Sequence, residues 1–179
     1  MEQKLQYIVD KIGELNIQIT EKQAEQFFRY YELLVEWNGF MNLTGITDFE
    51  EVVCKHFVDS LSIISTKDMS TVDNLIDIGT GAGFPGLPLK IAFPNVKVTL
   101  LDSLNKRIQF LDHVIEETGL TDIETIHGRA EDYAKDAAYR EKYDLCVSRA
   151  VANLATLSEY CLPYVKVGGM FIPYKSGEI

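Results

Sequence analysis

The second part of the chain alternates short apolar runs with stretches of helical periodicity, and this alternation limits the fold more than any other feature. The predicted strands cover residues 75–78, 96–101, 123–126, 143–147 and 170–174, and the predicted helices cover 86–93, 104–118, 130–138 and 153–164. Strands that alternate with helices form parallel sheets with right-handed crossovers, and near-continuous apolar strands are buried on both faces. The sequence therefore predicts a doubly wound α/β fold, whose ligands bind where the strands end.

The first part of the chain is helical in its periodicity. A capping box at Thr20 and Gln23 begins one predicted helix, and Asp48 begins a second that extends to about residue 64. We therefore expect an N-terminal helical cap over residues 1–68 and an α/β core over residues 69–179.

Composition excludes several classes of protein. The net charge of -10 argues against broad non-specific binding to nucleic acid, although a local basic patch remains compatible with it. The three cysteines include no CxxC, so neither a metal site nor a disulfide framework is predicted. No apolar run reaches the roughly 18 residues of a membrane span. We expect a cytoplasmic protein with no metal and no membrane partner.

The loop after the first predicted strand carries the strongest signal for a ligand. Gly81, Gly83 and Gly86 fit the GxGxxG pattern, in which glycines permit positive φ and close approach of a ligand. That pattern alone does not separate dinucleotides from adenosyl cofactors. Asp77, which precedes Gly79, is expected at the opening of the pocket. Its charge would repel a pyrophosphate and suit the ammonium group of a methionine moiety, which favours S-adenosylmethionine (SAM) over NAD.

Later strand ends carry further candidates. Asp102 ends the second strand, where a carboxylate can accept both ribose hydroxyls of SAM or of NAD. The competing interpretation is a helix cap, for which Ser103 is the better placed residue. The loop over 127–132 lies where an adenine edge would sit, although its acidic residues are also typical of a helix start. Arg149 could hold the methionine carboxylate, stack on a base or form a structural ion pair.

No residue is assigned as a catalytic base. The sequence has neither the Asn-Pro-Pro-aromatic segment common in amino-group methylation of bases nor a Pro-Cys thiol. Cys146 falls inside a predicted strand and is expected in the core. Arg149 is the one candidate for a direct catalytic contribution.

The sequence resembles one family closely, the bacterial small-subunit (16S) ribosomal RNA guanine-N7 methyltransferases, also called glucose-inhibited division protein B. The motifs that carry the resemblance are Trp37-Asn38, Asn42-Leu43-Thr44, His56 to Leu61, Leu75 to Gly86, Asp102 to Arg107, Gly128 to Glu131 and Ser148 to Ala152. The resemblance implies a Rossmann-like SAM-dependent methyltransferase that acts on guanine N7, with small-subunit ribosomal RNA or the ribosomal particle as its partner.

The resemblance also implies particular contacts. It places SAM against Gly79, Phe84, Ala130, Glu131 and Arg149, and RNA against Asn42, Thr44 and His56. His56 has a plainer interpretation, because Asp59 lies one turn away and both could bond at the seam between cap and core. Lys106 and Arg107 open a predicted helix, where they could touch RNA phosphate or simply face solvent.

The family continues for a helix and two strands beyond the last residue of this sequence. We therefore expect the C-terminal strands of the usual sheet to be missing and residues 170–174 to form a sheet edge. Two other classes stay open at this point. One is an NAD-dependent oxidoreductase, which rests on GxGxxG and Asp102, and the other is a non-catalytic Rossmann-like binding module.

Overall fold

A computed structural model describes residues 1–149 and 152–174. Its centre is a single five-stranded sheet in the order β3-β2-β1-β4-β5, and every neighbouring pair of strands is parallel. The strands are β1 (Asn74–Ile78), β2 (Lys97–Asp102), β3 (Ile123–His127), β4 (Tyr143–Arg149) and β5 (Val165–Tyr174). The predicted α/β class is confirmed. The order reverses between β1 and β4, so the switch point lies where β1 and β4 end.

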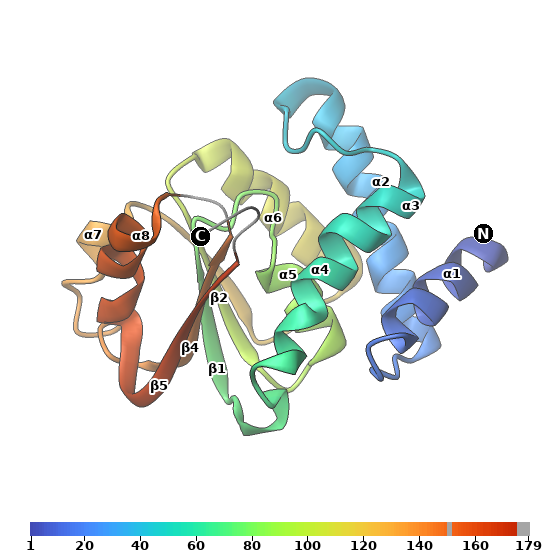
Figure 1. Cartoon of the computed structure of the whole chain (residues 1–179). Helices are drawn as coiled ribbons and strands as arrows, with labels where there is room; N and C mark the ends of the chain where they lie inside the picture. The colour runs from blue at the N-terminus through green and yellow to red at the C-terminus, as the bar shows by residue number, and fades with distance from the viewer. Residues whose placement is uncertain (150–151, 175–179) are drawn as a thin grey trace.

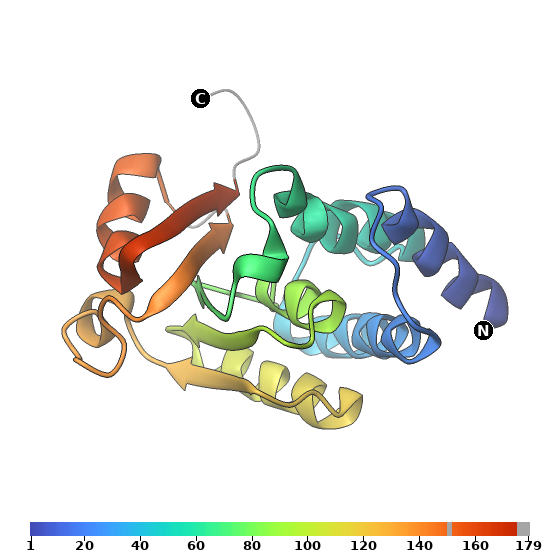
Figure 2. The same cartoon turned by 90° about the horizontal axis from the view of Figure 1, so that it is seen from below.

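Helices cover both faces of this sheet (Figures 1 and 2). The α-helices are α1 (Glu2–Gly13), α2 (Glu21–Met41), α3 (Phe49–Val52), α4 (Asp59–Leu61), α5 (Gly86–Ala92), α6 (Asn105–Thr118), α7 (Ala130–Tyr133) and α8 (Leu154–Cys161). In Figure 1, α5 and α6 lie on the same side of the sheet as α1 to α4, whereas α7 and α8 lie on the other side. None of the helices described is long and apolar enough to cross a membrane.

The N-terminal helices begin as the sequence predicts. The Thr20 side chain accepts from the Gln23 amide, and the Gln23 side chain accepts from the Thr20 amide, which completes the capping box. Asp48 accepts from the Glu51 amide. The helix predicted from Asp48 to residue 64 is confirmed in its extent, but its hydrogen-bond pattern changes along its length. It runs through α3, a π-helical turn (Val53–Val58), α4 and a 3-10 turn (Ser62–Ser65). Such π turns are rare and are often found at functional sites.

The hydrophobic core is continuous from the N-terminal helices to the sheet. Phe27 and Tyr30 of α2 pack with Phe57 of the π turn, at ring-centroid distances of 5.0 and 5.5 Å, and all three side chains are fully buried. Leu87 of α5 and Phe110 of α6 belong to the same buried cluster. The N-terminal helices therefore pack on α5 and α6, and they reach the sheet itself at the ends of β4 and β5.

Two predicted boundaries are wrong. The helix predicted over 130–138 ends at Tyr133, and the turn that follows is held by the Asp136 carboxylate, which accepts from the Ala138 amide. The last strand begins at Val165 rather than at Met170, and its register against β4 shifts near Tyr143. In the described part of the chain β5 pairs only with β4, so it is an edge strand as predicted.

Candidate active site

The glycine loop after β1 has the backbone that the sequence predicts. Gly79, Gly81 and Gly83 have φ angles of 67°, 60° and 101°, a region that side chains with a Cβ rarely adopt. At Gly83 the loop packs tightly against α5 and α2. An added Cβ there would lie 2.5 Å from Leu87 Cδ1 and 2.7 Å from Tyr30 Oη. The two positions thus need glycine for different reasons: Gly81 for its φ angle, and Gly83 also for space.

Asp77 lies under this loop, and the expectation that it stands at the opening of the pocket is wrong. Its side chain is 0% exposed, and Oδ2 accepts from Thr80 Oγ1 at 2.7 Å and from the Gly86 amide at 2.8 Å. Oδ1 is buried and has no partner among the described residues. Burial raises the pKa of Asp77 to about 7, although its two hydrogen-bond donors act in the opposite direction.

Asp102 joins the loop after β2 to the glycine loop. Its Oδ2 accepts from the Gly81 amide at 2.9 Å, and Oδ1 accepts from the Leu104 amide at 2.9 Å. Arg107 Nη1 lies 3.5 Å from Oδ2. The carboxylate therefore holds the Leu104 amide just before α6, and neither it nor Ser103, the better placed residue by sequence, caps the helix itself. A carboxylate has about four lone-pair sites, so acceptors remain for a bound ligand.

A pocket of about 490 Å³ opens above the ends of β1 and β2. Its lining is Leu43, Thr44, His56, Gly79, Thr80, Gly81, Ala82, Phe84, Asp102, Ser103, Arg107 and Arg149. The residues come from the carboxyl ends of three parallel strands and from the N-terminal helices. We call it the cofactor pocket, because its position is the one at which doubly wound sheets bind ligands.

Arg149, at the end of β4, connects the sheet to the N-terminal helices. Its Nη2 lies 2.9 Å from His56 Nδ1, and its Nη1 lies 3.4 Å from Asp59 Oδ2 and 3.5 Å from the Lys55 carbonyl oxygen. The guanidinium also lies 4.9 Å from the centroid of the Phe84 ring. The structural ion pair that the sequence left open is therefore present, and it is made at the wall of the pocket.

The contacts of His56 fix its protonation state. Arg149 cannot accept a hydrogen bond, so His56 Nδ1 must be the acceptor and Nε2 carries the proton. Nε2 then donates to Thr44 Oγ1 at 2.8 Å. The imidazole stacks on Phe84 at 4.4 Å and 14°. Burial and the Arg149 charge lower the pKa of His56 to about 4, so the ring is neutral at pH 7.

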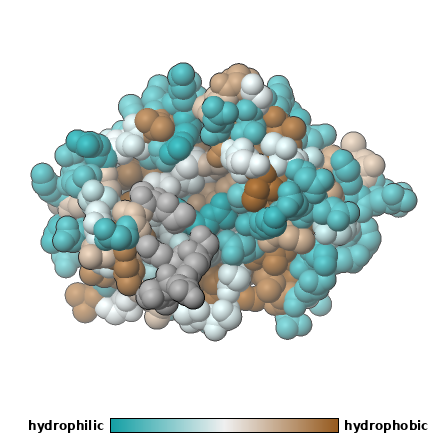
Figure 3. All heavy atoms as spheres, turned by 45° about the horizontal axis from the view of Figure 1, so that its top comes forward, coloured by the Kyte–Doolittle hydropathy of each residue, from teal (hydrophilic) through white to brown (hydrophobic). Residues whose placement is uncertain are grey.

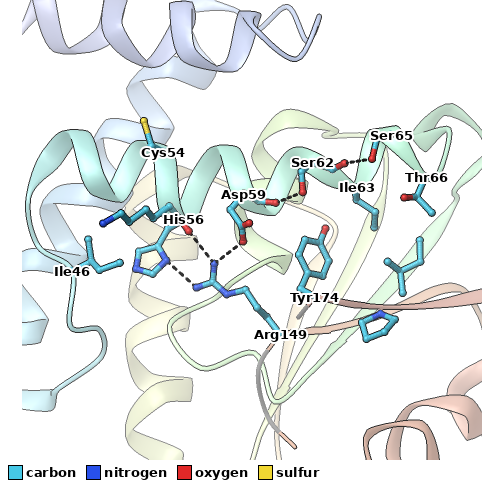
Figure 4. A pocket seen from close by; sticks show the side chains of 13 residues that line it. Ile46, Cys54, His56, Asp59, Ser62, Ile63, Ser65, Thr66, Arg149 and Tyr174 are labelled. Atoms are coloured by element: carbon cyan, nitrogen blue, oxygen red, sulfur yellow. Dashed lines mark hydrogen bonds and ion pairs between the residues drawn. The ribbon is translucent and has the colours of Figure 1, made fainter. Parts of the chain in front are cut away.

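A second pocket of about 700 Å³ lies on the other side of this arginine, between the N-terminal helices and β5 (Figure 4). His56 and Arg149 line both pockets. Asp59, Tyr174 and Pro173 line only the second, which we call the seam pocket. The seam between the N-terminal helices and the core is thus hollow beside the cofactor pocket.

Other predicted residues lie outside both linings. Glu131 is exposed at the start of α7, and Ala130 beside it is buried with its carbonyl oxygen bound to the Tyr164 hydroxyl. The turn that carries them is nevertheless adjacent to the cofactor pocket. The Gly128 amide donates at 3.0 Å to the carbonyl oxygen of Asp102, which lines that pocket. Asn42 is exposed in the αL position that ends α2, and Lys106 is exposed on α6. Cys146 is fully buried in β4, as predicted.

Three residues that shape the site were not predicted from the sequence. Thr80 fixes Asp77, Tyr30 donates to the Ala82 carbonyl at 2.5 Å, and Ser148 donates to the Ile78 carbonyl at 2.7 Å. Ser148 precedes Arg149 directly, so its position in a motif was a usable signal. Tyr30 gave none, because it is one apolar position among many on a helix. Within the described ranges no group of three His, Cys, Asp or Glu side chains is arranged to hold a metal.

Solved structures of other proteins share the fold of this chain. An S-adenosyl-L-methionine-dependent methyltransferase from Methanococcus maripaludis, so assigned provisionally, superposes with a TM-score of 0.58 at 18% identity, covering 80% of this chain and 61% of that one. A protein from Staphylococcus aureus provisionally described as a caffeoyl-CoA O-methyltransferase gives 0.55 at 19% identity, covering 80% and 65%. The fold is therefore that of the Rossmann-like methyltransferases.

Sequence comparison then gives the family. The profile of the GidB family, described as rRNA small subunit methyltransferase G, matches residues 23–178. Ribosomal RNA small subunit methyltransferase G of Lachnoclostridium phytofermentans is 57% identical over 171 residues, 96% of this chain and 71% of that protein. Its counterpart in Alkaliphilus metalliredigens is 51% identical over 179 residues, 100% of this chain and 74% of that protein. The chain belongs to the rRNA small subunit methyltransferase G family.

Proposed function

We propose that this protein transfers the methyl group of SAM to N7 of a guanine in small-subunit ribosomal RNA. Family membership gives the reaction class, and the position of Arg149 carries the proposal. The Arg149 side chain lines both the cofactor pocket and the seam pocket, which is large enough for a second ligand. A ribosomal substrate supports a cytoplasmic location.

The residues of the cofactor pocket and of the segments around it fit SAM. The buried Asp77 Oδ1 has no partner among described residues, so a cationic ammonium group reaching it would supply the missing donor. Asp102 retains acceptors for the ribose hydroxyls. Arg149 would hold the methionine carboxylate, and Ala130 and Glu131 would face the adenine end. SAM, when bound, supplies a sulfonium-activated methyl group.

This chemistry needs no general base. Guanine N7 carries a free lone pair in the major-groove edge of the base, so no proton has to leave before attack. His56 is neutral and has both ring nitrogens engaged, so it orients Arg149 and Thr44 instead of moving a proton. Catalysis then rests on alignment of the two substrates, which can contribute roughly 7–11 kcal/mol.

The reaction is tested by incubating the protein and SAM with small ribosomal particles and analysing the nucleosides by mass spectrometry. We expect 7-methylguanosine. Methyl groups found only in protein, or only on another base atom, would contradict the proposal. Calorimetry with SAM and with NAD separates the oxidoreductase alternative, since only SAM should bind. A protein that binds SAM but never turns over would instead be the non-catalytic binding module.

Substitution of Asp102 by alanine should weaken SAM binding. A charge-assisted hydrogen bond contributes about 1.5–3 kcal/mol, so the dissociation constant should rise roughly ten- to a hundredfold. Titration calorimetry measures the change. Asp112→Ala is a suitable control, because that carboxylate is on α6 and bonds to Thr125 outside the pocket. Equal affinities of the wild type and of Asp102→Ala for SAM would show that Asp102 does not bind the cofactor.

Lys106 and Arg107 are the cations at the start of α6, beside the cofactor pocket. The face that carries the strand ends is largely hydrophilic, with apolar side chains in separate patches (Figure 3). If both cations touch phosphate, their double alanine variant should reduce the slope of log K against log salt by about 1.4–1.8. A Lys97→Ala, Lys142→Ala control removes two exposed cations from the opposite end of the sheet. An unchanged slope in the first variant would show that these side chains only face solvent.

A further inference from the structure

The seam pocket has the position and the lining of a site for the base that is methylated. It lies between the N-terminal segment 46–66 and the ends of β4 and β5, and it shares His56 and Arg149 with the cofactor pocket. Its volume of about 700 Å³ is within the range of small-molecule sites, which is roughly 300–1,000 Å³. The His56–Arg149 pair would therefore lie between a ligand in this pocket and the cofactor.

The side chains of the seam pocket include planar groups and one accessible carboxylate. The Tyr174 hydroxyl donates to the Ser60 carbonyl at 2.6 Å, which holds its ring in the pocket wall beside Pro173. Aromatic rings and the planes of arginine guanidinium groups are suitable surfaces for an unstacked base, and Tyr174, His56 and Arg149 provide them here. Asp59 extends into the same space from the first turn of α4, as Figure 4 shows. The pocket thus offers stacking surfaces and a negatively charged acceptor together.

Asp59 is only half used by the protein. Its side chain is 51% exposed, and Oδ2 has one long contact of 3.4 Å with Arg149 Nη1. Oδ1 has no hydrogen-bond partner in the described parts of the chain. If the carboxylate served only to hold Arg149, the shorter bond to His56 at 2.9 Å would already do this. Oδ1 is therefore free, and Oδ2 keeps a second lone pair, so the carboxylate can accept two N–H bonds from a ligand.

We infer that Asp59 selects guanine by accepting hydrogen bonds from N1–H and the 2-amino group of the base in the seam pocket. This inference rests on the proposed function and names the residue that recognises the guanine to which the methyl group is transferred. Guanine alone among the four RNA bases has two adjacent donors on its Watson–Crick edge, and a carboxylate accepts two parallel N–H bonds. Enzymes that act on an extruded base commonly read this edge.

This orientation also leaves N7 available. N7 belongs to the imidazole ring, whereas N1 and the 2-amino group belong to the pyrimidine ring. Asp59 lines only the seam pocket and does not line the cofactor pocket. A guanine held at its pyrimidine ring by Asp59 can therefore present its imidazole ring toward the shared wall and the cofactor. An adenine in the same pose would place the unprotonated N1 against the carboxylate and be rejected.

The test compares guanosine with inosine, which lacks only the 2-amino group. Small-subunit ribosomal RNA is transcribed with a minor fraction of inosine in place of guanosine and assembled into particles. After methylation by the full chain, mass spectrometry gives the ratio of 7-methylguanosine to 7-methylinosine relative to the input. We expect the wild type to favour guanosine by about ten- to a hundredfold, the effect of one charge-assisted hydrogen bond.

The Asp59→Asn variant should lose this preference, so that the two nucleosides are methylated in proportion to the input. Asp59→Asn keeps an oxygen for Arg149, and the same RNA pool reports on both proteins, so effects of inosine on RNA folding cancel. Asp112→Asn, an exposed carboxylate on α6 outside both pockets, is the control and should retain the wild-type ratio. A preference unchanged in Asp59→Asn would overturn the inference. Absence of 7-methylguanosine with the wild type would instead overturn the proposed function.

Discussion

Replacing Gly83 with alanine should destabilise the folded protein by about 2–5 kcal/mol, the sum expected for a strained positive φ and for overpacking. At φ 101° an added Cβ meets Leu87 Cδ1 at 2.5 Å and the Tyr30 hydroxyl at 2.7 Å. The Tyr30 hydroxyl holds the Ala82 carbonyl, so the glycine loop must also move. We expect SAM binding to fall with stability, because the loop that carries Gly81 would be displaced.

Urea unfolding followed by circular dichroism measures the stability change, and calorimetry measures the loss of SAM binding. Two other glycines serve as matched controls. Gly81 has a φ angle of 60° but no atom within 4 Å of an added Cβ, so Gly81→Ala should lower the free energy of unfolding by only about 1–2 kcal/mol. Gly45→Ala has neither strain nor a close atom and should be nearly neutral. Equal losses for Gly81→Ala and Gly83→Ala would show that contact under the loop is unimportant.

Asp77 should make the protein less stable as pH rises toward neutrality. Its pKa in the folded state is raised by burial to about 7, against a model-peptide value of 3.8. The folded state therefore binds the proton more tightly than the unfolded state. The contribution of Asp77 to the free energy of unfolding is fully present below pH 3.8, and it is lost progressively as the pH rises to about 7.

The comparison that isolates this effect is Asp77→Asn. From pH 5 to pH 8 the free energy of unfolding of the wild type should fall by about 2–3 kcal/mol more than that of the variant. The figure comes from the two pH units between 5 and about 7, at about 1.4 kcal/mol each. Urea unfolding at the two pH values measures it. The exposed Asp132→Asn should follow the wild type. A wild type and Asp77→Asn with parallel pH profiles would show that Asp77 is ionised without cost in the folded state.

The same substitution should act in the opposite direction on the cofactor. If the SAM ammonium group binds the unpartnered Asp77 Oδ1, the neutral amide should weaken SAM binding about ten- to a hundredfold. A more stable protein at pH 8 that binds SAM less tightly would indicate that burial of Asp77 serves the ligand. Unchanged affinity would assign the carboxylate to the loop alone, where it holds Thr80 and Gly86.

The sequence by itself determined the parallel sheet and the positions of its ligand loops. Alternating apolar strands and helices allow few other arrangements, because crossovers between parallel strands have one hand and ligands bind at strand ends. The glycines at 79, 81 and 83 were predictable as well, since local backbone sterics make positive φ a property of residue type. The Thr20 capping box was readable for the same reason, because its bonds span only three residues.

Only the tertiary structure decided how the two parts of the chain make one site. Arg149 contacts His56 and Asp59 across 93 and 90 residues of sequence, and no local pattern encodes such a pairing. The burial of Asp77 depends on packing from β2 and α5, so the sequence placed it at an opening that it does not occupy. The bond from the Leu104 amide to Asp102, in place of a helix cap by Ser103, likewise follows from the course of the backbone after β2. Contacts between distant segments form only when the whole core packs, and they are what separate a generic α/β pocket from this site.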